Sequence, residues 1–167
     1  MQHNVIALLQ ELRAYALEKG LKAAIFYHEE ESYLMRFANS AISLNTNEHL
    51  VRFQISVYDG NKRAETMLLA DPGQIEPLKR GIDTAAEMAR LAQPLDYTPS
   101  IPVYPESVID MQAYDPFLAV TTNAERLEFF NTLARGLETE ELKLSGVFSN
   151  GITTTAQIST ESEHTQF

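Results

Sequence analysis

The sequence predicts an α+β fold in which an antiparallel β-meander packs against about three helices. Apolar residues recur at helical spacing in three separate segments, and other segments alternate apolar and polar residues as strands do. The dipeptides Asp59–Gly60 and Asn150–Gly151 are typical of tight hairpin turns, so neighbouring strands are expected to run antiparallel. Helices and strands in this arrangement indicate the α+β class.

The composition is that of a globular protein. The 167 residues are 44% hydrophobic and 22% charged, and this length predicts a single domain whose core needs no disulfide or metal. No uninterrupted apolar run exceeds five residues, so no transmembrane helix is expected, and the N-terminal segment lacks the features of a signal peptide. Together with the absence of cysteine, this predicts a cytoplasmic location.

The charge of the chain argues against two classes of partner. The formal net charge is −10, and the 13 basic residues are scattered along the sequence. Nucleic acids and anionic membranes are bound by clustered Lys and Arg side chains. We therefore expect no nucleic-acid partner and no membrane partner.

Residues 4–19 are the first expected helix, with Asn4 as its cap and Gly20 after its end. Its apolar stripe is expected to pack on a sheet and consists of Val5, Leu8, Leu9, Leu12 and Ala16. Two strands follow at residues 23–28 and 32–38, with an acidic turn at residues 29–31 between them.

A clean alternation over residues 50–58 predicts a strand that turns at Asp59–Gly60. One face of this hairpin is apolar and the other is polar, and a slip of one residue would mix them. The predicted apolar pairs are Val57 with Lys62, Ile55 with Ala64, Phe53 with Thr66, and Val51 with Leu68.

The polar pair Asn39–Ser40 interrupts an apolar segment. Phe37 and Ile42 both fit the core, yet they have opposite parity in a regular strand. An extra residue near Asn39 would restore the phase, so a β-bulge is predicted here. Because bulges re-aim side chains near sites, Arg36 and Asn39 are the candidate ligand-facing residues.

Residues 71–93 are the second expected helix, with Asp71 as cap, Pro72 in its first turn and Gln74 as capping-box partner. Pro77 does not fit a helix interior, so a regular part that begins only at Pro77 is the alternative. Its buried stripe is predicted to be Leu78, Ile82, Ala85, Ala86 and Ala89. The proline-rich residues 93–122 then form a connecting arm, which is either functional or held against the surface.

The third expected helix begins at Thr122, where Glu125 completes a capping box, and ends near Leu137. Its predicted apolar stripe is Leu127, Phe130, Leu133 and Leu137. Two further strands are expected on either side of Asn150–Gly151.

The residues that could carry chemistry do not form a recognisable active site. His28, Glu29 and Glu30 do not fit the helical His-Glu-x-x-His zinc motif, because the second histidine is missing and the segment reads as a strand end. The four histidines are scattered, and no nucleophile elbow or phosphate-binding loop occurs. We therefore predict no catalytic residue and no metal ligand in this chain.

Several short motifs occur in an order that resembles the amino-terminal part of the TldD/PmbA family. The motifs are RFANSAI (36–42), YDG (58–60), AAEMAR (85–90), YDP (114–116), NAERLEFF (123–130) and SNG (149–151). The segment AYDPF (113–117) is more similar to the PmbA half of the family than to the TldD half. The resemblance covers most of the chain.

The resemblance implies a function in proteolysis. Members of this family are metallopeptidase subunits, once called modulators of DNA gyrase, that act in peptide maturation and antitoxin degradation. Their zinc-binding His-Glu-x-x-x-His motif lies in a catalytic half, and this chain has no such motif. The resemblance thus implies a single non-catalytic α+β domain over residues 1–167, cut from a longer chain and inactive alone, with zinc in the catalytic half.

Such a domain would contribute to a homo- or heterodimer and to a groove for a peptide or unfolded polypeptide. Arg36 and Asn39 are the candidate peptide-binding residues in that groove. Two alternatives remain: a stand-alone, non-enzymatic protein-interaction module that uses residues 93–122, and a small hydrolase with dispersed catalytic residues.

Overall fold

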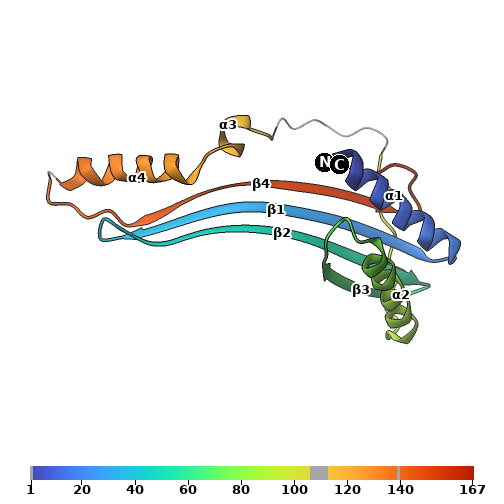
Figure 1. Ribbon diagram of the computed structural model, residues 1–167. Coiled ribbons are helices and arrows are strands. Elements are labelled where there is room, and N and C mark those ends of the chain that lie inside the picture. The colour runs from blue at the N-terminus through green and yellow to red at the C-terminus, as the bar shows by residue number, and fades with distance from the viewer. Residues whose placement is uncertain (1, 106–112, 139) are drawn as a thin grey trace. The chain divides into compact units, whose positions relative to one another are not determined.

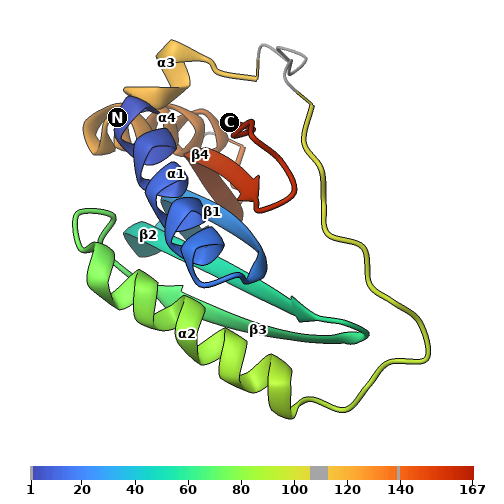
Figure 2. The same cartoon turned by 90° about the vertical axis from the view of Figure 1, so that its right-hand side faces the viewer.

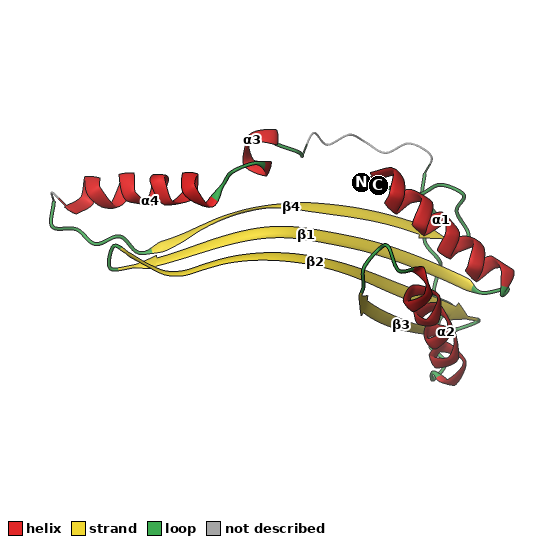
Figure 3. Ribbon diagram, viewed as in Figure 1, coloured by secondary structure: helices red, strands yellow, loops and turns green. Residues whose placement is uncertain are grey.

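The computed structural model describes residues 2–105, 113–138 and 140–167 (Figure 1). Within these residues the elements follow one another in the order α1 (Gln2–Glu18), β1 (Lys22–Ala38), β2 (Ala41–Asp59), β3 (Lys62–Leu69), α2 (Ile75–Leu91), α3 (Pro116–Ala119), α4 (Asn123–Glu138) and β4 (Gly146–Ser159). The strands form an antiparallel sheet in the order β3-β2-β1-β4 (Figure 3). The predicted α+β class is confirmed, and the helices α1, α2 and α4 match the three expected ones.

The chain divides into two compact units. Unit 1 consists of Met1–Glu29, Leu50–Ile109 and Thr154–Phe167, and unit 2 of Glu30–His49 and Asp110–Thr153. Helices α1 and α2 and strand β3 lie in unit 1, whereas α3 and α4 lie in unit 2. Strands β1, β2 and β4 contribute a part to each unit.

The core of unit 1 lies between its two helices and its strands, and α2 runs along β3 (Figure 2). The predicted stripes of the first two helices are confirmed, since Leu8 is partly buried and the other residues of both stripes are buried. The buried residues are Val5, Leu9, Leu12, Ala16, Ala23, Ile25, Tyr27, Phe53, Ile55, Val57, Leu78, Ile82, Ala85, Ala86, Ala89, Ala156 and Ile158.

Polar contacts join α1 to α2 at the edge of this core. Tyr15 Oη donates to Asp83 Oδ2 at 2.9 Å, and Lys19 Nζ donates to Asp83 Oδ1 at 2.5 Å. Partial burial would raise the pKa of Asp83, but these two hydrogen bonds outweigh it and hold that pKa below its usual value. Gly20 follows α1 with φ of 66°, which is consistent with its predicted place after the helix.

The hairpin between β2 and β3 has the predicted faces but a register shifted by two residues. The turn residues are Gly60 and Asn61, so Asp59 pairs with Lys62 instead of leading the turn. Gly60 has φ of 60° at the first turn position, where a II′ turn requires glycine. A shift of two leaves every side chain on its predicted face, and the resulting pairs include Val57 with Ala64, Ile55 with Thr66 and Phe53 with Leu68.

The predicted bulge at Asn39 is wrong, because Asn39 and Ser40 form a turn between β1 and β2. Their φ angles are 50° and 58°, which matches a two-residue turn with positive φ at both positions. The opposite parity of Phe37 and Ile42 therefore results from the reversal of the chain between β1 and β2 and not from an extra residue in one strand. The acidic turn predicted at residues 29–31 is also wrong, because β1 continues through these residues.

Helix α2 begins at Ile75, four residues after the start of the predicted range 71–93, and the expected capping box does not form. Gln74 is the N-cap but makes no side-chain capping hydrogen bond. Asp71 instead closes a turn before the helix: its Oδ1 accepts from the N–H of Gly73 at 2.8 Å, and its carbonyl accepts from the N–H of Gln74 at 2.9 Å. Asp and Asn side chains favour such turns.

The structure describes part of the connecting arm predicted at residues 93–122. The described residues contain the short helix α3, and residues 106–112 lie outside them. In unit 1 the arm is tied to the β2–β3 turn, where Leu95 and Asn61 exchange two hydrogen bonds of 2.9 Å. It is also tied to the C-terminal segment, where Ser162 Oγ donates to the carbonyl of Tyr104 at 3.1 Å.

Unit 2 has a small apolar core beneath α4. Met35, Phe130 and Ala134 are buried, and three partly buried side chains pack against them: Phe37, Leu144 and Phe148. The capping box at the start of α4 is confirmed, because Glu125 Oε2 accepts from the N–H of Thr122 at 2.7 Å and Thr122 Oγ1 accepts from the N–H of Glu125 at 3.3 Å.

The predicted stripe of α4 is correct only in part. Phe130 is buried, but Leu127 and Leu133 are 43% and 41% exposed. The buried face instead carries Arg126, Phe130 and Ala134, which lie four residues apart. An arginine can occupy a buried position because its guanidinium finds hydrogen-bond acceptors there.

The two strands predicted around Asn150–Gly151 are one continuous strand, β4. A Cβ on Gly151 would lie 2.7 Å from the carbonyl oxygen of Glu31 and 3.2 Å from Cα of Ser32. Gly151 therefore allows β4 to approach the backbone of β1 closely, a role that glycine has within strands as well as in turns.

Candidate functional site

Arg36 and Asn39 lie at one end of unit 2. Arg36 is exposed on β1, and its carbonyl accepts a hydrogen bond from Ser43 Oγ at 3.2 Å. Asn39 is exposed at the first position of the β1–β2 turn, and its N–H donates to Ser145 Oγ at 3.2 Å. These contacts use backbone atoms of Arg36 and Asn39, so their peptide-binding role stays a prediction.

The β1–β2 turn is held from outside by the residues that precede β4. The N–H of Ser40 donates to the carbonyl of Leu144 at 2.9 Å, and the N–H of Leu144 donates to Ser40 Oγ at 3.0 Å. Ser40 has positive φ, which costs a non-glycine residue on the order of 1 kcal/mol. These external hydrogen bonds offset that cost and give the turn a defined position within unit 2.

The buried Arg126 is the polar centre of unit 2, and its side chain is 2% exposed. Nη1 donates to the carbonyl of Thr121 and to Asn150 Oδ1, each at 2.8 Å, and Nη2 donates to Asn123 Oδ1 at 2.7 Å. The guanidinium carbon lies 4.3 Å from the ring centroid of Tyr33, in the range of a cation–π contact. The side chain thus connects α4 to β1, β4 and the end of α3.

The environment of Arg126 is unusual for a buried cation. Its described hydrogen-bond acceptors are all neutral, and its Nε has no hydrogen-bond partner among the described residues. Tyr33 donates its hydroxyl proton to Glu31, and this hydrogen bond raises the pKa of Tyr33. The Glu31 carboxylate is therefore linked to the Arg126 guanidinium through the Tyr33 phenol, which both of them contact.

The sequence analysis missed this cluster because each member had a simpler interpretation. Arg126 follows Glu125 in a capping sequence and lies outside the apolar stripe predicted for that helix. Asn150 was expected in a hairpin turn, whereas its Oδ1 accepts from Arg126 and its Nδ2 donates to the carbonyl of Leu118 at 3.0 Å. The spacing of Arg126 with Phe130 and Ala134 is the pattern that could have identified it.

Among the described residues, no group of three or more histidine, cysteine, aspartate or glutamate side chains could hold a metal ion. His28 lies on β1 and His49 on β2, and the His28 ring lies 6.3 Å from that of Phe26. The described part of the chain also contains no helix that is long and apolar enough to cross a membrane.

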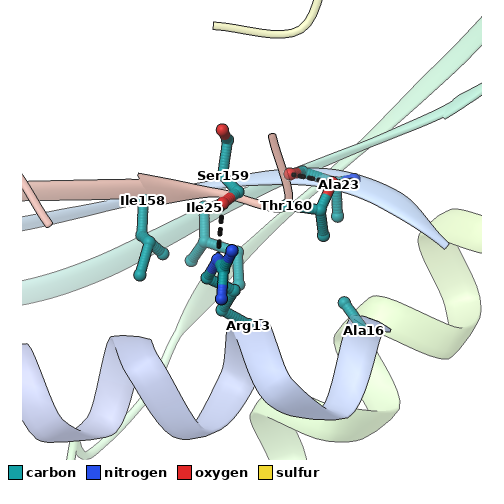
Figure 4. A pocket seen from close by; sticks show the side chains of 7 residues that line it. All are labelled: Arg13, Ala16, Ala23, Ile25, Ile158, Ser159 and Thr160. Atoms are coloured by element: carbon teal, nitrogen blue, oxygen red, sulfur yellow. Dashed lines mark hydrogen bonds between the residues drawn. The ribbon is translucent and has the colours of Figure 1, made fainter. Parts of the chain in front are cut away.

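A small depression in unit 1 lies between α1 and the strands (Figure 4). Arg13 Nε donates to the carbonyl of Ser159 at 3.0 Å, and Thr160 Oγ1 accepts from the N–H of Ala23 at 3.0 Å. The depression has no room for a water molecule, so these hydrogen bonds fasten α1 and β1 to β4 and leave no site for a ligand.

Three solved structures share this fold. The chain aligns with a proposed modulator of DNA gyrase from Bacteroides thetaiotaomicron (TM-score 0.70, 16% identity), covering 92% of this chain and 36% of that one. It aligns with TldE from Thermococcus kodakarensis (0.66, 15%), covering 92% and 35%. It aligns with a proposed modulator of a DNA gyrase from Thermotoga maritima (0.65, 12%), covering 93% and 35%.

These similarities confirm the predicted resemblance at the level of the fold. The chain spans about a third of the length of these proteins, as one domain of them would. At these sequence identities the similarity shows the fold, and the activity needs a separate test. No protein-family model and no curated protein sequence matches the chain.

Proposed function

We propose that this chain is a non-catalytic domain of a TldD/TldE-type protein and serves proteolysis by binding a partner subunit and a peptide. One observation carries the proposal: more than nine-tenths of the chain shares its fold with about a third of each of three such proteins. The order of the motifs in the sequence gives the same family independently. On this proposal the protein acts in the cytoplasm, with zinc in a catalytic half elsewhere.

An edge of β2 in unit 2 that lies outside the described ladder with β3 supports the peptide-binding part of the proposal. The ladder between β2 and β3 covers Arg52–Asp59 of β2, so residues 41–49 lie outside it. All but one of residues 41–49 are exposed. An extended peptide can add to such an edge through main-chain hydrogen bonds, which recognise a polypeptide without requiring a particular sequence.

Arg36 and Asn39 lie next to this edge in the sequence: Arg36 is near the end of β1, and Asn39 is the first residue of the turn from which β2 starts. An exposed guanidinium can bind a peptide carbonyl or carboxylate, and an exposed amide can both donate and accept. We propose that these two side chains hold the backbone of a peptide that lies along residues 41–49.

The test uses the natural protein that contains this chain, mixed with a TldD-type protein from the same organism and with casein as unfolded substrate. We expect zinc-dependent cleavage by the mixture and neither zinc nor cleavage with residues 1–167 alone. Replacing Arg36→Ala together with Asn39→Gly, which preserves the turn, should lower kcat/KM about tenfold, since each lost hydrogen bond costs about 0.5–1.5 kcal/mol.

The matched control is Arg80→Ala, which removes an exposed arginine from α2 in unit 1. It should leave cleavage unchanged. Cleavage by the Arg36/Asn39 double variant at the wild-type rate, in a complex of unchanged mass, would refute the peptide-binding role of these residues. Absence of a complex would refute the proposed partner subunit itself.

A further inference from the structure

A short segment of unit 2 presents large apolar side chains to solvent. The segment consists of α3, which is labelled in Figure 1, and the residue after it. Within it Phe117 is 83% exposed, Leu118 53% and Val120 71%. Single exposed apolar residues are common on protein surfaces, but here three large ones occur within four positions of one segment. We call these three side chains the α3 knob.

The α3 knob is held in place by polar contacts. Asp115 Oδ1 accepts from the N–H groups of Phe117 and Leu118 at 2.8 and 3.3 Å. Asn150 Nδ2 donates to the carbonyl of Leu118 at 3.0 Å, and the buried Arg126 donates to the carbonyl of Thr121 at 2.8 Å. The segment is therefore fixed at its start, middle and end while its apolar side chains stay outside the core.

This fixation favours binding. A partner that binds a segment whose backbone is already ordered avoids the entropy cost of ordering that backbone, and exposed aromatic anchors often dominate the energy of an interface. The Arg126 cluster contributes to this fixation through the hydrogen bond to the carbonyl of Thr121. The hydrogen bonds of Arg126 also offset the cost of burying its charge.

The exposed charged residues near the α3 knob in the sequence are negative. Between residues 113 and 133 the acidic residues are Asp115, Glu125 and Glu128, and the one basic residue is Arg126, which is buried. Hydrogen bonds from Thr122 hold the pKa of Glu125 below its usual value, so this carboxylate stays ionised at neutral pH. A complementary surface is therefore apolar at its centre and basic at its rim.

The charge also distinguishes two possible occupants. A second copy of this chain would bring its own net charge of −10 and the same three carboxylates to the contact. Like charges at an interface oppose association. A different protein with exposed lysines and arginines around an apolar pocket meets no such repulsion.

We infer that the α3 knob docks into an apolar pocket, bordered by Lys and Arg side chains, on a different protein. This inference rests on the proposed function, since the partner it names is the TldD-type subunit of the same complex.

The first experiment removes the apolar side chains. Phe117→Ser with Val120→Ser in the natural protein should weaken its affinity for the TldD-type protein by at least about tenfold, as expected for an interface anchor. The matched control, Leu91→Ser, removes a side chain that is 87% exposed on α2 in unit 1 and should change Kd less than twofold. Circular dichroism verifies that all variants fold.

The second experiment reverses a charge. Glu128→Lys should slow association severalfold and reduce its dependence on salt, whereas Glu18→Lys on α1, also exposed, should change association less. Faster association of Glu128→Lys would overturn the basic rim. Self-association of the natural protein that the double serine variant abolishes would overturn the choice of a different protein as occupant.

The outcomes separate the two levels of the proposal. A normal complex with unchanged affinity in the double serine variant overturns the role of the α3 knob and leaves the proposed function standing. A natural protein that forms no complex with the TldD-type protein at all overturns the proposed function and the partner inferred here together.

Discussion

Unit 1 and unit 2 each contain parts of β1, β2 and β4 but bury different kinds of side chain. Among the described residues, α1 and α2 enclose seventeen buried apolar residues in unit 1, whereas α4 covers three in unit 2 and adds the buried Arg126. Unit 1 thus rests on apolar burial, whose energy grows with area and has no preferred direction. Unit 2 rests to a larger extent on directional hydrogen bonds.

The difference has a functional consequence. Hydrogen bonds can fix a segment at the surface without burying its side chains, as they do for the α3 knob in unit 2. An apolar core cannot, since it stabilises only what it encloses. Unit 2 is therefore suited to present surfaces, namely the α3 knob and the exposed residues at the start of β2, while unit 1 supplies stability.

The largest predicted effect is a loss of stability from a substitution in the core of unit 1. Leu9 is fully buried on α1, so Leu9→Ala should lower the free energy of unfolding by about 2–5 kcal/mol through lost burial and the cavity left behind. Leu17→Ala, on the same helix with 44% exposure, is the matched control and should cost clearly less. Urea denaturation measures both values, and equal losses would contradict the apolar account of unit 1.

The next effect concerns the polar centre of unit 2. Arg126→Met keeps the length of the side chain but leaves Thr121 O, Asn123 Oδ1 and Asn150 Oδ1 without this donor, at a cost of about 1–3 kcal/mol. Hydrogen exchange should accelerate in α4 more than in α2. Exposed Arg135→Met on α4 serves as control. A gain in stability would mean that burying the cation costs more than its hydrogen bonds return.

The sequence predicted the fold best where burial is periodic. The stripes of α1 and α2 and the faces of the β2–β3 hairpin follow from apolar spacing alone, because one face of each element must be covered. The errors lie where local and tertiary effects compete. Asn39–Ser40 reverses the chain, and Asn150–Gly151 does not, although the second pair has the stronger turn preference.

The tertiary reasons for these errors were not visible in the sequence. Ser145 and Leu144 hold the Asn39–Ser40 turn from more than a hundred residues away, and Gly151 serves a close approach to β1. The Arg126 cluster likewise combines residues from three elements. Arg36 and Asn39 are exposed in the structure, and their peptide-binding role stays a prediction.

The smallest predicted effects sharpen the comparison by making one substitution in both units. A Cβ on Gly81 of α2 would lie 2.3 Å from Cδ1 of Leu68 and 3.1 Å from Cδ1 of Ile55, while a Cβ on Gly136 of α4 would have no neighbour within 4 Å. Within a helix, Ala is more favourable than Gly by up to about 1 kcal/mol, and crowding a packed core costs about 1–3 kcal/mol.

Gly81→Ala should therefore destabilise the protein by about 1 kcal/mol, because the ends of two side chains must shift to admit the methyl group. Gly136→Ala should stabilise it by about 0.5–1 kcal/mol, because the backbone gains and nothing is displaced. Thermal unfolding of the two variants beside the wild type measures the sign of each change in stability. Stabilisation by both substitutions would show that the contact between α2 and β3 has space for a methyl group. Destabilisation by both would show that α4 is as closely packed at Gly136 as α2 is at Gly81.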